Sequence, residues 1–271
     1  MTLPRSALLA AWAGAVAAGR AGASEALAAV AGDDEPHRVA WATDSLPPPE
    51  LPVPDDGWLS DLLVLLAAAG ERAPVTVRCL LPRPGDLRGL PGPGSLHGAA
   101  VDAGECVAVD LGAAGGDPLV VWCVPEIEEF GPAGDVGRLA TWRLWRAGPV
   151  VASALPTSLP EADQAFRLAL ADAADALERL DAASWRPDEA VQAASAVSAR
   201  RDGGAPLPPT VGPRSLRLLT RAEHVLAIAD VAEGTPGGTV NGWEAAQREQ
   251  ALAGLARAAR DAVAAAVSLP G

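Results

Sequence analysis

Residues 85–98 form a glycine- and proline-rich stretch that holds several side chains able to contact a small ligand. Arg88, Ser95 and His97 lie within it, between a predicted strand and a predicted short helix. Glycine-rich loops in such a place let backbone amides approach an anion at the start of a helix. Ser95 and His97 are two positions apart, so they face different sides of a helix or stand roughly 6.5 Å apart on a strand. The stretch is therefore either a ligand loop or a simple connection, and we expect no local nucleophile–base pair.

The same stretch does not complete a known glycine motif. A nucleophile elbow needs glycine two positions before and after its serine, whereas Ser95 has Pro93 and His97 there. His97 also takes the place of the third glycine of a dinucleotide-binding loop. We therefore expect no catalytic residue here and no cofactor.

Two carboxylates, Glu126 and Glu128, share a face if the acidic segment 126–129 is extended, because alternate residues of a strand point the same way. An acid and base pair of this kind needs desolvation, which the sequence does not show. A small-molecule enzyme site between residues 85–98 and 126–129 is one hypothesis. A solvated strand end is the other interpretation.

A metal ion would need the cysteines and histidines of the chain to converge. Their spacing matches no zinc signature, and cysteine in an apolar strand is commonly a small buried hydrophobic residue. Three thiols leave one unpaired in any disulfide scheme, which is typical of a reducing compartment. We expect no metal site and a cytoplasmic location. The residues concerned are Cys79, Cys106, Cys123, His37, His97 and His224.

Tryptophan and arginine alternate at the end of the strand-rich region, where Trp142 and Trp145 lie among arginines. This pattern could form a stacking platform for single-stranded nucleic acid. The net charge of −13 argues against that partner, because nucleic acid is bound through accumulated positive charge. We expect Trp142 and Trp145 to stack with arginine inside the protein or at an interface.

A basic stripe is predicted on a C-terminal helix, because Arg217, Arg221 and His224 recur at helical spacing. The first helix of the tail carries several acidic residues, Asp163 among them. Pairing between these two helices is the expected role of the stripe. An anion site or a docking surface for a partner is the alternative.

Composition excludes several kinds of chemistry. All 21 basic residues are arginine, and the chain has no tyrosine. These absences exclude a Schiff-base lysine, a P-loop lysine and a tyrosine acid or nucleophile. The acidic balance disfavours an anionic membrane, and no stretch reaches the roughly 20 apolar residues that span a bilayer. The apolar run at residues 7–19 continues past Arg20 and predicts a helix rather than a secretory leader.

Hydrophobic periodicity predicts helices first, strands in the middle and helices at the end. The fold class is α+β, with a small mixed, mainly antiparallel sheet and N-terminal helices, followed by a C-terminal bundle of about four helices. The expected domains are residues 1–155 and 156–271, unless the chain is one continuous domain. We expect early helices at 6–31 and 58–69, a proline-rich loop at 44–56, about four strands at 74–81, 105–111, 118–124 and 138–146, and tail helices starting near 158, 187, 213 and 241.

These patterns favour a binding or assembly module that lacks catalysis and associates with itself. Its eight tryptophans support this hypothesis, because indole side chains often dominate the energetics of protein interfaces. We expect neither nucleic acid nor membrane as a partner. The small-molecule enzyme is the alternative, and the sequence leaves its ligand unknown.

Overall fold

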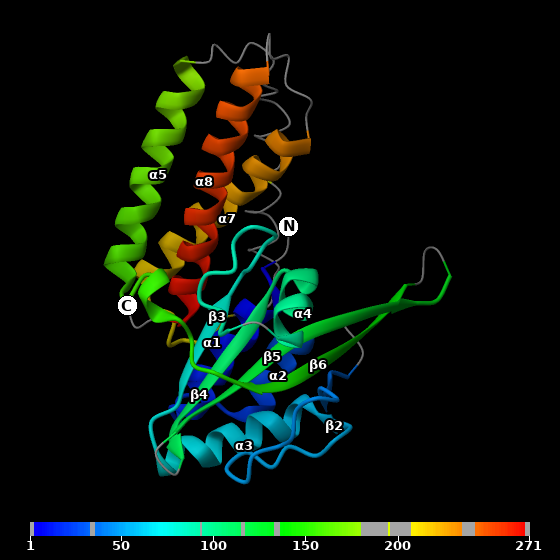
Figure 1. Ribbon diagram of the computed structural model, residues 1–271. Coiled ribbons are helices and arrows are strands. Elements are labelled where there is room, and N and C mark those ends of the chain that lie inside the picture. The colour runs from blue at the N-terminus through cyan, green and yellow to red at the C-terminus, as the bar shows by residue number, and fades with distance from the viewer. Residues whose placement is uncertain are drawn as a thin grey trace. The chain divides into compact units, whose positions relative to one another are not determined.

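The computed structural model describes residues 3–32, 36–92, 94–114, 117–132, 136–179, 195, 207–234 and 242–268 (Figure 1). The chain divides into two compact units. The sheet unit comprises Pro4–Leu155 with Ala205–Val211, and the helical unit comprises Met1–Leu3, Pro156–Gly204 and Gly212–Gly271. No helix in the described residues has the length and apolar character that crossing a membrane requires.

The sheet unit is built on six strands in the order β2-β1-β6-β5-β4-β3. Only the β1–β6 pair is parallel, and the other four pairs are antiparallel. The predicted α+β class with a mixed, mainly antiparallel sheet is therefore confirmed, although six strands replace the expected four. The strands are β1 Arg38–Trp41, β2 Gly57–Trp58, β3 Thr76–Leu80, β4 Cys106–Ala114, β5 Asp117–Phe130 and β6 Gly137–Ala147.

Helices cover the two faces of this sheet unequally. The helix α1 (Arg5–Ala17) contacts β3, β4 and β5 and also packs on α2 (Ala23–Ala31) and α3 (Leu59–Arg72). It is buried along most of its length, which suits its alanine-rich sequence. The helix α4 (Ser95–Ala103) packs on β5 through Leu96 and Ala100, in a cluster that includes Trp122 and Trp145.

Glu105 joins the start of α1 to the sheet. Its Oε2 atom accepts a hydrogen bond of 2.7 Å from the backbone N–H of Ser6, in the first turn of α1. The first amides of a helix have no partner inside the helix, so a carboxylate in this place stabilises the helix start. Burial nevertheless raises the pKa of Glu105 above its usual 4.5, while the hydrogen bonds from Ser6 and the charges of Arg5 and Arg83 lower it.

The three cysteines are free and buried, and they lie on neighbouring strands. Cys79 and Cys123 both stand opposite Val107 of β4, so their side chains share one face of the sheet. Cys106 is the next residue along β4 and points to the other face. Burial raises the pKa of all three thiols, that of Cys123 to about 12, which keeps them protonated and unreactive.

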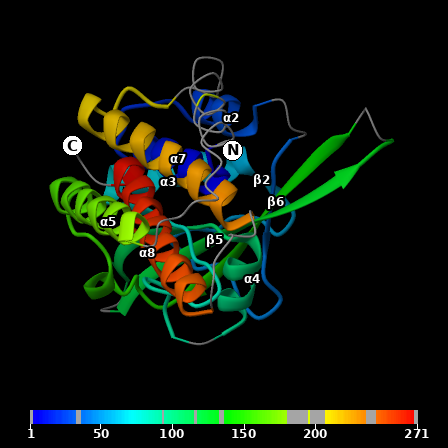
Figure 2. The same cartoon turned by 90° about the horizontal axis from the view of Figure 1, so that it is seen from above.

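The helical unit contains α5 (Leu159–Arg179), α7 (Pro213–Gly234) and α8 (Gly242–Ser268), and α8 packs against both of the others (Figure 2). The start of α5 was predicted from Ser158 and Glu161. The Oγ atom of Ser158 does accept the N–H of Glu161, but the Glu161 carboxylate binds Thr157. The tail helix expected to start near residue 187 falls in a part of the chain where only residue 195 is described.

The strands β1 and β2 and the full length of β5 were not predicted. The strands β1 and β2 are only four and two residues long and carry no clear alternation of their own. The strand expected at 118–124 is longer, because β5 continues to Phe130, and the segment 126–129 forms its exposed end. The proline-rich segment 44–56 is a loop without helix or strand, as predicted.

Candidate functional site

Residues 85–98, which could be a ligand loop or a simple connection, are held in part by contacts with one another and with Arg83. Arg88 forms an ion pair with Asp86, at 2.7 Å between Nε and Oδ1. Arg83 and Asp86 close a tight turn through two backbone hydrogen bonds, with Gly85 in a left-handed conformation at its tip. The guanidinium of Arg88 thus already has a carboxylate partner within the loop.

Ser95 links three parts of the sheet unit. It is the first residue of α4, and its Oγ atom donates to Oδ2 of Asp44 at 2.6 Å. The same Oγ accepts a hydrogen bond of 2.9 Å from Nε1 of Trp145 on β6. His97 lies half-buried on α4, and the structure shows no hydrogen bond between it and Ser95. These two hydrogen bonds tie the start of α4 to Asp44 and to β6.

The acidic residues lie well away from this loop. Glu126 stands opposite Thr141 in the β5–β6 register, four positions along β6 from Trp145. At about 3.3 Å per residue, that separation is roughly 13 Å. Glu128 lies farther along the same face, so the structure does not bring the two halves of the hypothetical enzyme site together.

Glu126 has a cationic partner on the neighbouring strand. Its Oε2 atom lies 2.8 Å from Nη2 of Arg143, and the hydrogen bond with Glu126 is the main cause that raises the pKa of Arg143. Glu129 forms a similar pair with Arg138, at 3.1 Å. Both pairs join β5 to β6, and they leave Glu128 as the carboxylate of this segment without an ion pair in the described residues.

Trp142 and Trp145 were expected to stack on arginine or to form an interface, and the structure places both in the core. Trp142 is fully buried, and its Nε1 atom donates to Nδ1 of His37. Trp145 is 7% exposed and bonded to Ser95. Neither indole is available on the surface of the sheet unit.

The basic stripe of the helical unit contacts α5 through Arg221. Arg221 forms an ion pair with Asp163 of α5 at 3.1 Å, and its guanidinium lies 5.5 Å from the ring centre of Phe166. This contact is the predicted pairing between the two helices. Arg217 is exposed, and His224 is half-buried.

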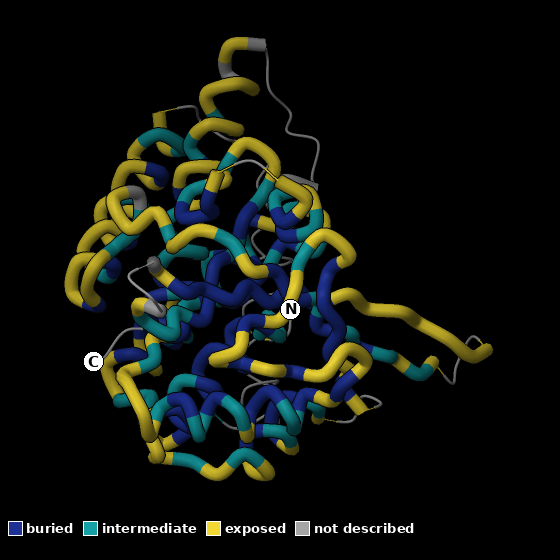
Figure 3. The backbone as a smooth tube through the Cα atoms, turned by 60° about the horizontal axis from the view of Figure 1, so that its bottom comes forward, coloured by how far each residue is buried: buried dark blue, intermediate teal, exposed yellow. Residues whose placement is uncertain are grey.

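One surface that no motif indicated is a projecting hairpin. We define the arm as residues 126–130 and 136–140, the outer parts of the β5–β6 hairpin (Figure 1). Pairing of β5 with β4 ends near Cys123, and pairing of β6 with β1 begins at Thr141. Both edges of the arm therefore lack a strand neighbour in the described part of the chain, and most of its residues are exposed (Figure 3).

Apolar side chains mark this arm. Ile127 is 38% exposed, Phe130 49% and Val136 47%. The ring of Phe130 lies over Gly137 on the opposite strand, so closely that a Cβ atom there would be only 2.5 Å from Cζ. A signal existed in the sequence, since Ile127 interrupts the acidic segment and Phe130 follows it. The pairing register that exposes them depends on other strands, so the segment alone does not predict it.

Two family models match the chain. The model described as "Rv1486c-like protein, N-terminal domain" matches residues 6–157, more than half of the chain. The model described as "Rv1486c-like protein, C-terminal domain" matches residues 160–264. No curated protein and no solved structure matches the chain.

Proposed function

The chain belongs to the Rv1486c-like family, and we propose that it is a binding module without catalysis that associates with a second copy of itself through the arm. The observation that carries this proposal is the pair of open strand edges at residues 126–130 and 136–140. Unpaired edges present rows of N–H and C=O groups that readily add another strand.

Local charge supports self-association at the arm. Two copies of a chain with a net charge of −13 repel each other, so a contact between them is best made where the charge is neutralised. The arm meets this condition in part, because Arg138 and the adjacent Arg143 neutralise Glu129 and Glu126, and Glu128 is the one carboxylate of residues 126–130 without an ion pair among the described residues.

The pattern of charges also distinguishes the two edges. Antiparallel pairing of the β5 edge with itself sets glutamates near one another, which is unfavourable. A twofold pairing of the β6 edge centred on Leu139 instead places Arg138 opposite Ala140 of the second copy. Such a pairing is short, so the apolar side chains Ile127, Phe130 and Val136 must supply much of the buried area.

The residues first considered for catalysis support a non-catalytic role. Arg88 is paired with Asp86, Ser95 is bonded to Asp44 and Trp145, and Glu126 is paired with Arg143. A cytoplasmic location fits the three free thiols, since such thiols persist in a reducing compartment.

Light scattering after size-exclusion chromatography tests the proposal. We expect the wild-type chain to be a dimer at micromolar concentration and Leu139→Arg to be a monomer, because two arginines then face each other at the twofold axis. Leu168→Arg is the matched control, since Leu168 is 58% exposed on α5 and lies outside the arm. A wild-type monomer, or a Leu139→Arg dimer of unchanged affinity, would refute the arm as the contact.

A further inference from the structure

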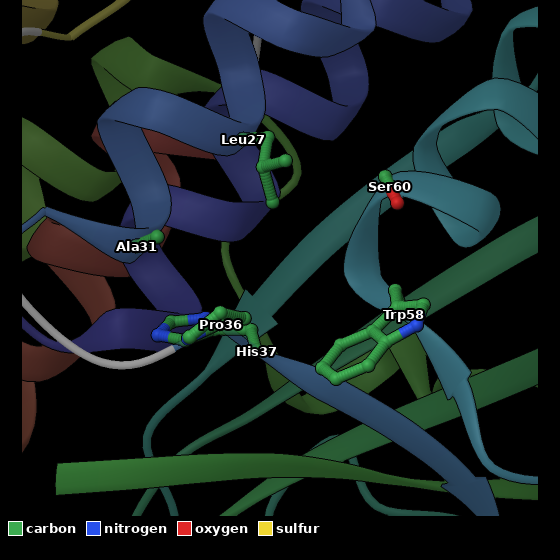
Figure 4. Close-up of a pocket in the computed structure, with 6 residues that line it drawn as sticks. All are labelled: Leu27, Ala31, Pro36, His37, Trp58 and Ser60. Carbon is green, nitrogen blue, oxygen red and sulfur yellow. The ribbon is translucent and has the colours of Figure 1, made fainter.

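A pocket of about 360 Å³ lies in the sheet unit, beside the start of α3 (Figure 4). Its walls come from three separate segments, and the close-up shows their side chains around a common space. The helix α2 provides Leu27 and Ala31, the segment before β1 provides Pro36 and His37, and the β2–α3 junction provides Trp58 and Ser60.

The indole of Trp58 forms one wall and is held from the sheet side. Trp58 stands directly opposite Arg38 in the β1–β2 register, and the Arg38 guanidinium carbon lies 5.8 Å from the indole centre. A cation at this distance is attracted to the ring face. The backbone N–H of Trp58 donates to Oδ2 of Asp61 at 2.8 Å, which fixes the chain where it enters α3. Trp58 is still 48% exposed, so a fixed aromatic surface remains open.

The opposite wall contains a buried imidazole of defined orientation. Nδ1 of His37 accepts the indole N–H of Trp142 at 3.1 Å. An indole nitrogen only donates, so Nδ1 carries no proton and the ring is the neutral tautomer protonated at Nε2. The backbone carbonyl of His37 also accepts the N–H of Leu59, which ties this wall to the start of α3.

We infer that this pocket binds a small, uncharged aromatic compound that stacks on Trp58. Of the described residues that line it, none carries a charged side chain, which argues against an ionic ligand. Its volume lies at the lower end of the range for small-molecule pockets, which suits one ring or two fused rings. The hydroxyl of Ser60 supplies a polar contact that orients such a ligand. The inference is independent of self-association through the arm.

Titration with indole, followed by NMR of the tryptophan and histidine ring signals, tests the inference. We expect saturable shifts of the Trp58 and His37 signals, with cyclohexanol and benzoate at least tenfold weaker because one lacks an aromatic ring and the other is charged. Ala31→Phe fills the pocket and should weaken indole binding at least tenfold. Trp58→Ala should do the same, and its exposed side chain makes the fold tolerant of the change.

Trp243→Ala is the matched control, because Trp243 is 68% exposed on α8 and lies outside the pocket. It should leave indole affinity unchanged. The inference is overturned if indole up to its solubility limit shifts neither ring signal, or if Ala31→Phe with an unchanged melting temperature binds indole as the wild type does. Equal affinity for cyclohexanol would overturn the aromatic class of the ligand. The wild-type titration decides the matter even if a variant fails to fold.

Discussion

Nε1 of Trp142 lies 3.1 Å from Nδ1 of His37, across 105 positions of sequence. Both side chains are buried, and their ring centres are 6.1 Å apart with planes inclined by 51°. The contact joins the strand β6 to the segment that leads into β1. A hydrogen bond shielded from water in this way is costly to break, because either partner is left without compensation.

We therefore expect Trp142→Phe to lower the free energy of unfolding by about 1–3 kcal/mol through the loss of this donor, with an added contribution from the smaller ring. Urea denaturation followed by circular dichroism measures the change. Trp243→Phe, an exposed position, should stay within about 0.5 kcal/mol of the wild type. Equal effects of the two substitutions would contradict a special role for the Trp142–His37 bond.

Gly70 allows α3 to approach α1 closely. A Cβ atom at Gly70 would collide with the backbone carbonyl of Ala17, which cannot turn away as a side chain can. Gly70→Ala should lower the free energy of unfolding by about 1–3 kcal/mol or more. Gly98→Ala on α4 is the matched control, since nothing lies within 4 Å of its Cβ position. It should raise stability by about 0.5–1 kcal/mol, because alanine favours a helix over glycine. Thermal and urea denaturation of both variants would show the opposite signs.

The Phe130–Gly137 contact predicts that Gly137→Ala has opposite effects on amide hydrogen exchange of the arm in the wild type and in a Phe130→Ala background. Gly137→Ala should push the Phe130 ring off the arm and speed amide hydrogen exchange there about fivefold, equivalent to about 1 kcal/mol. In a Phe130→Ala background the same substitution meets no ring. It should then slow exchange slightly, because glycine weakens a strand. Additive effects in this double-mutant cycle would show that the two residues are not coupled.

Glu105 predicts a pH dependence of stability. Because burial raises its pKa above 4.5, the folded chain keeps this proton at pH values where the unfolded chain has lost it. The stability contributed by Glu105 is therefore greatest below pH 4.5 and falls as pH rises through the raised pKa. Glu105→Gln keeps an acceptor for the Ser6 amide without ionising, so its stability relative to the wild type should increase across that window.

Urea denaturation at several pH values between 4 and 7 measures this difference for Glu105→Gln. Glu105→Ala serves as the control, because it removes the acceptor of the 2.7 Å bond and should destabilise the chain at every pH. Parallel stability profiles for the wild type and Glu105→Gln would disprove the assignment.

Much of the fold follows from local pattern, and the exceptions share one physical cause. The strands β3 to β6 were all expected near their observed positions, because each carries a run of apolar or alternating residues. The strand β5 was expected to end at residue 124, yet it continues to Phe130. Cross-strand pairs such as Glu126 with Arg143 stabilise that extension, and their register cannot be read from one segment.

The pocket also could not be predicted from single segments of the sequence. His37 was considered only as a metal ligand, and Trp58 only as the start of a helix. They line one pocket because β1 pairs with β2 across a loop. The buried positions of Trp142 and Trp145 also depend on which face of β6 is covered. Composition indicated that tryptophan matters here, but only the sheet topology decides which indoles are exposed.

The parallel pairing of β1 with β6 has a consequence for biosynthesis. Arg38 of β1 pairs with Thr141, so β1 leaves the ribosome about a hundred residues before the strand it must join. Contacts between distant segments form slowly, because a long loop must close first. The strand β1 and its partner β2 must therefore wait, without the rest of the sheet beside them, until β6 is made. A nascent chain arrested before residue 137 should engage chaperones, because β6 has not been made. A chain long enough to expose all residues up to 155 outside the ribosome should not.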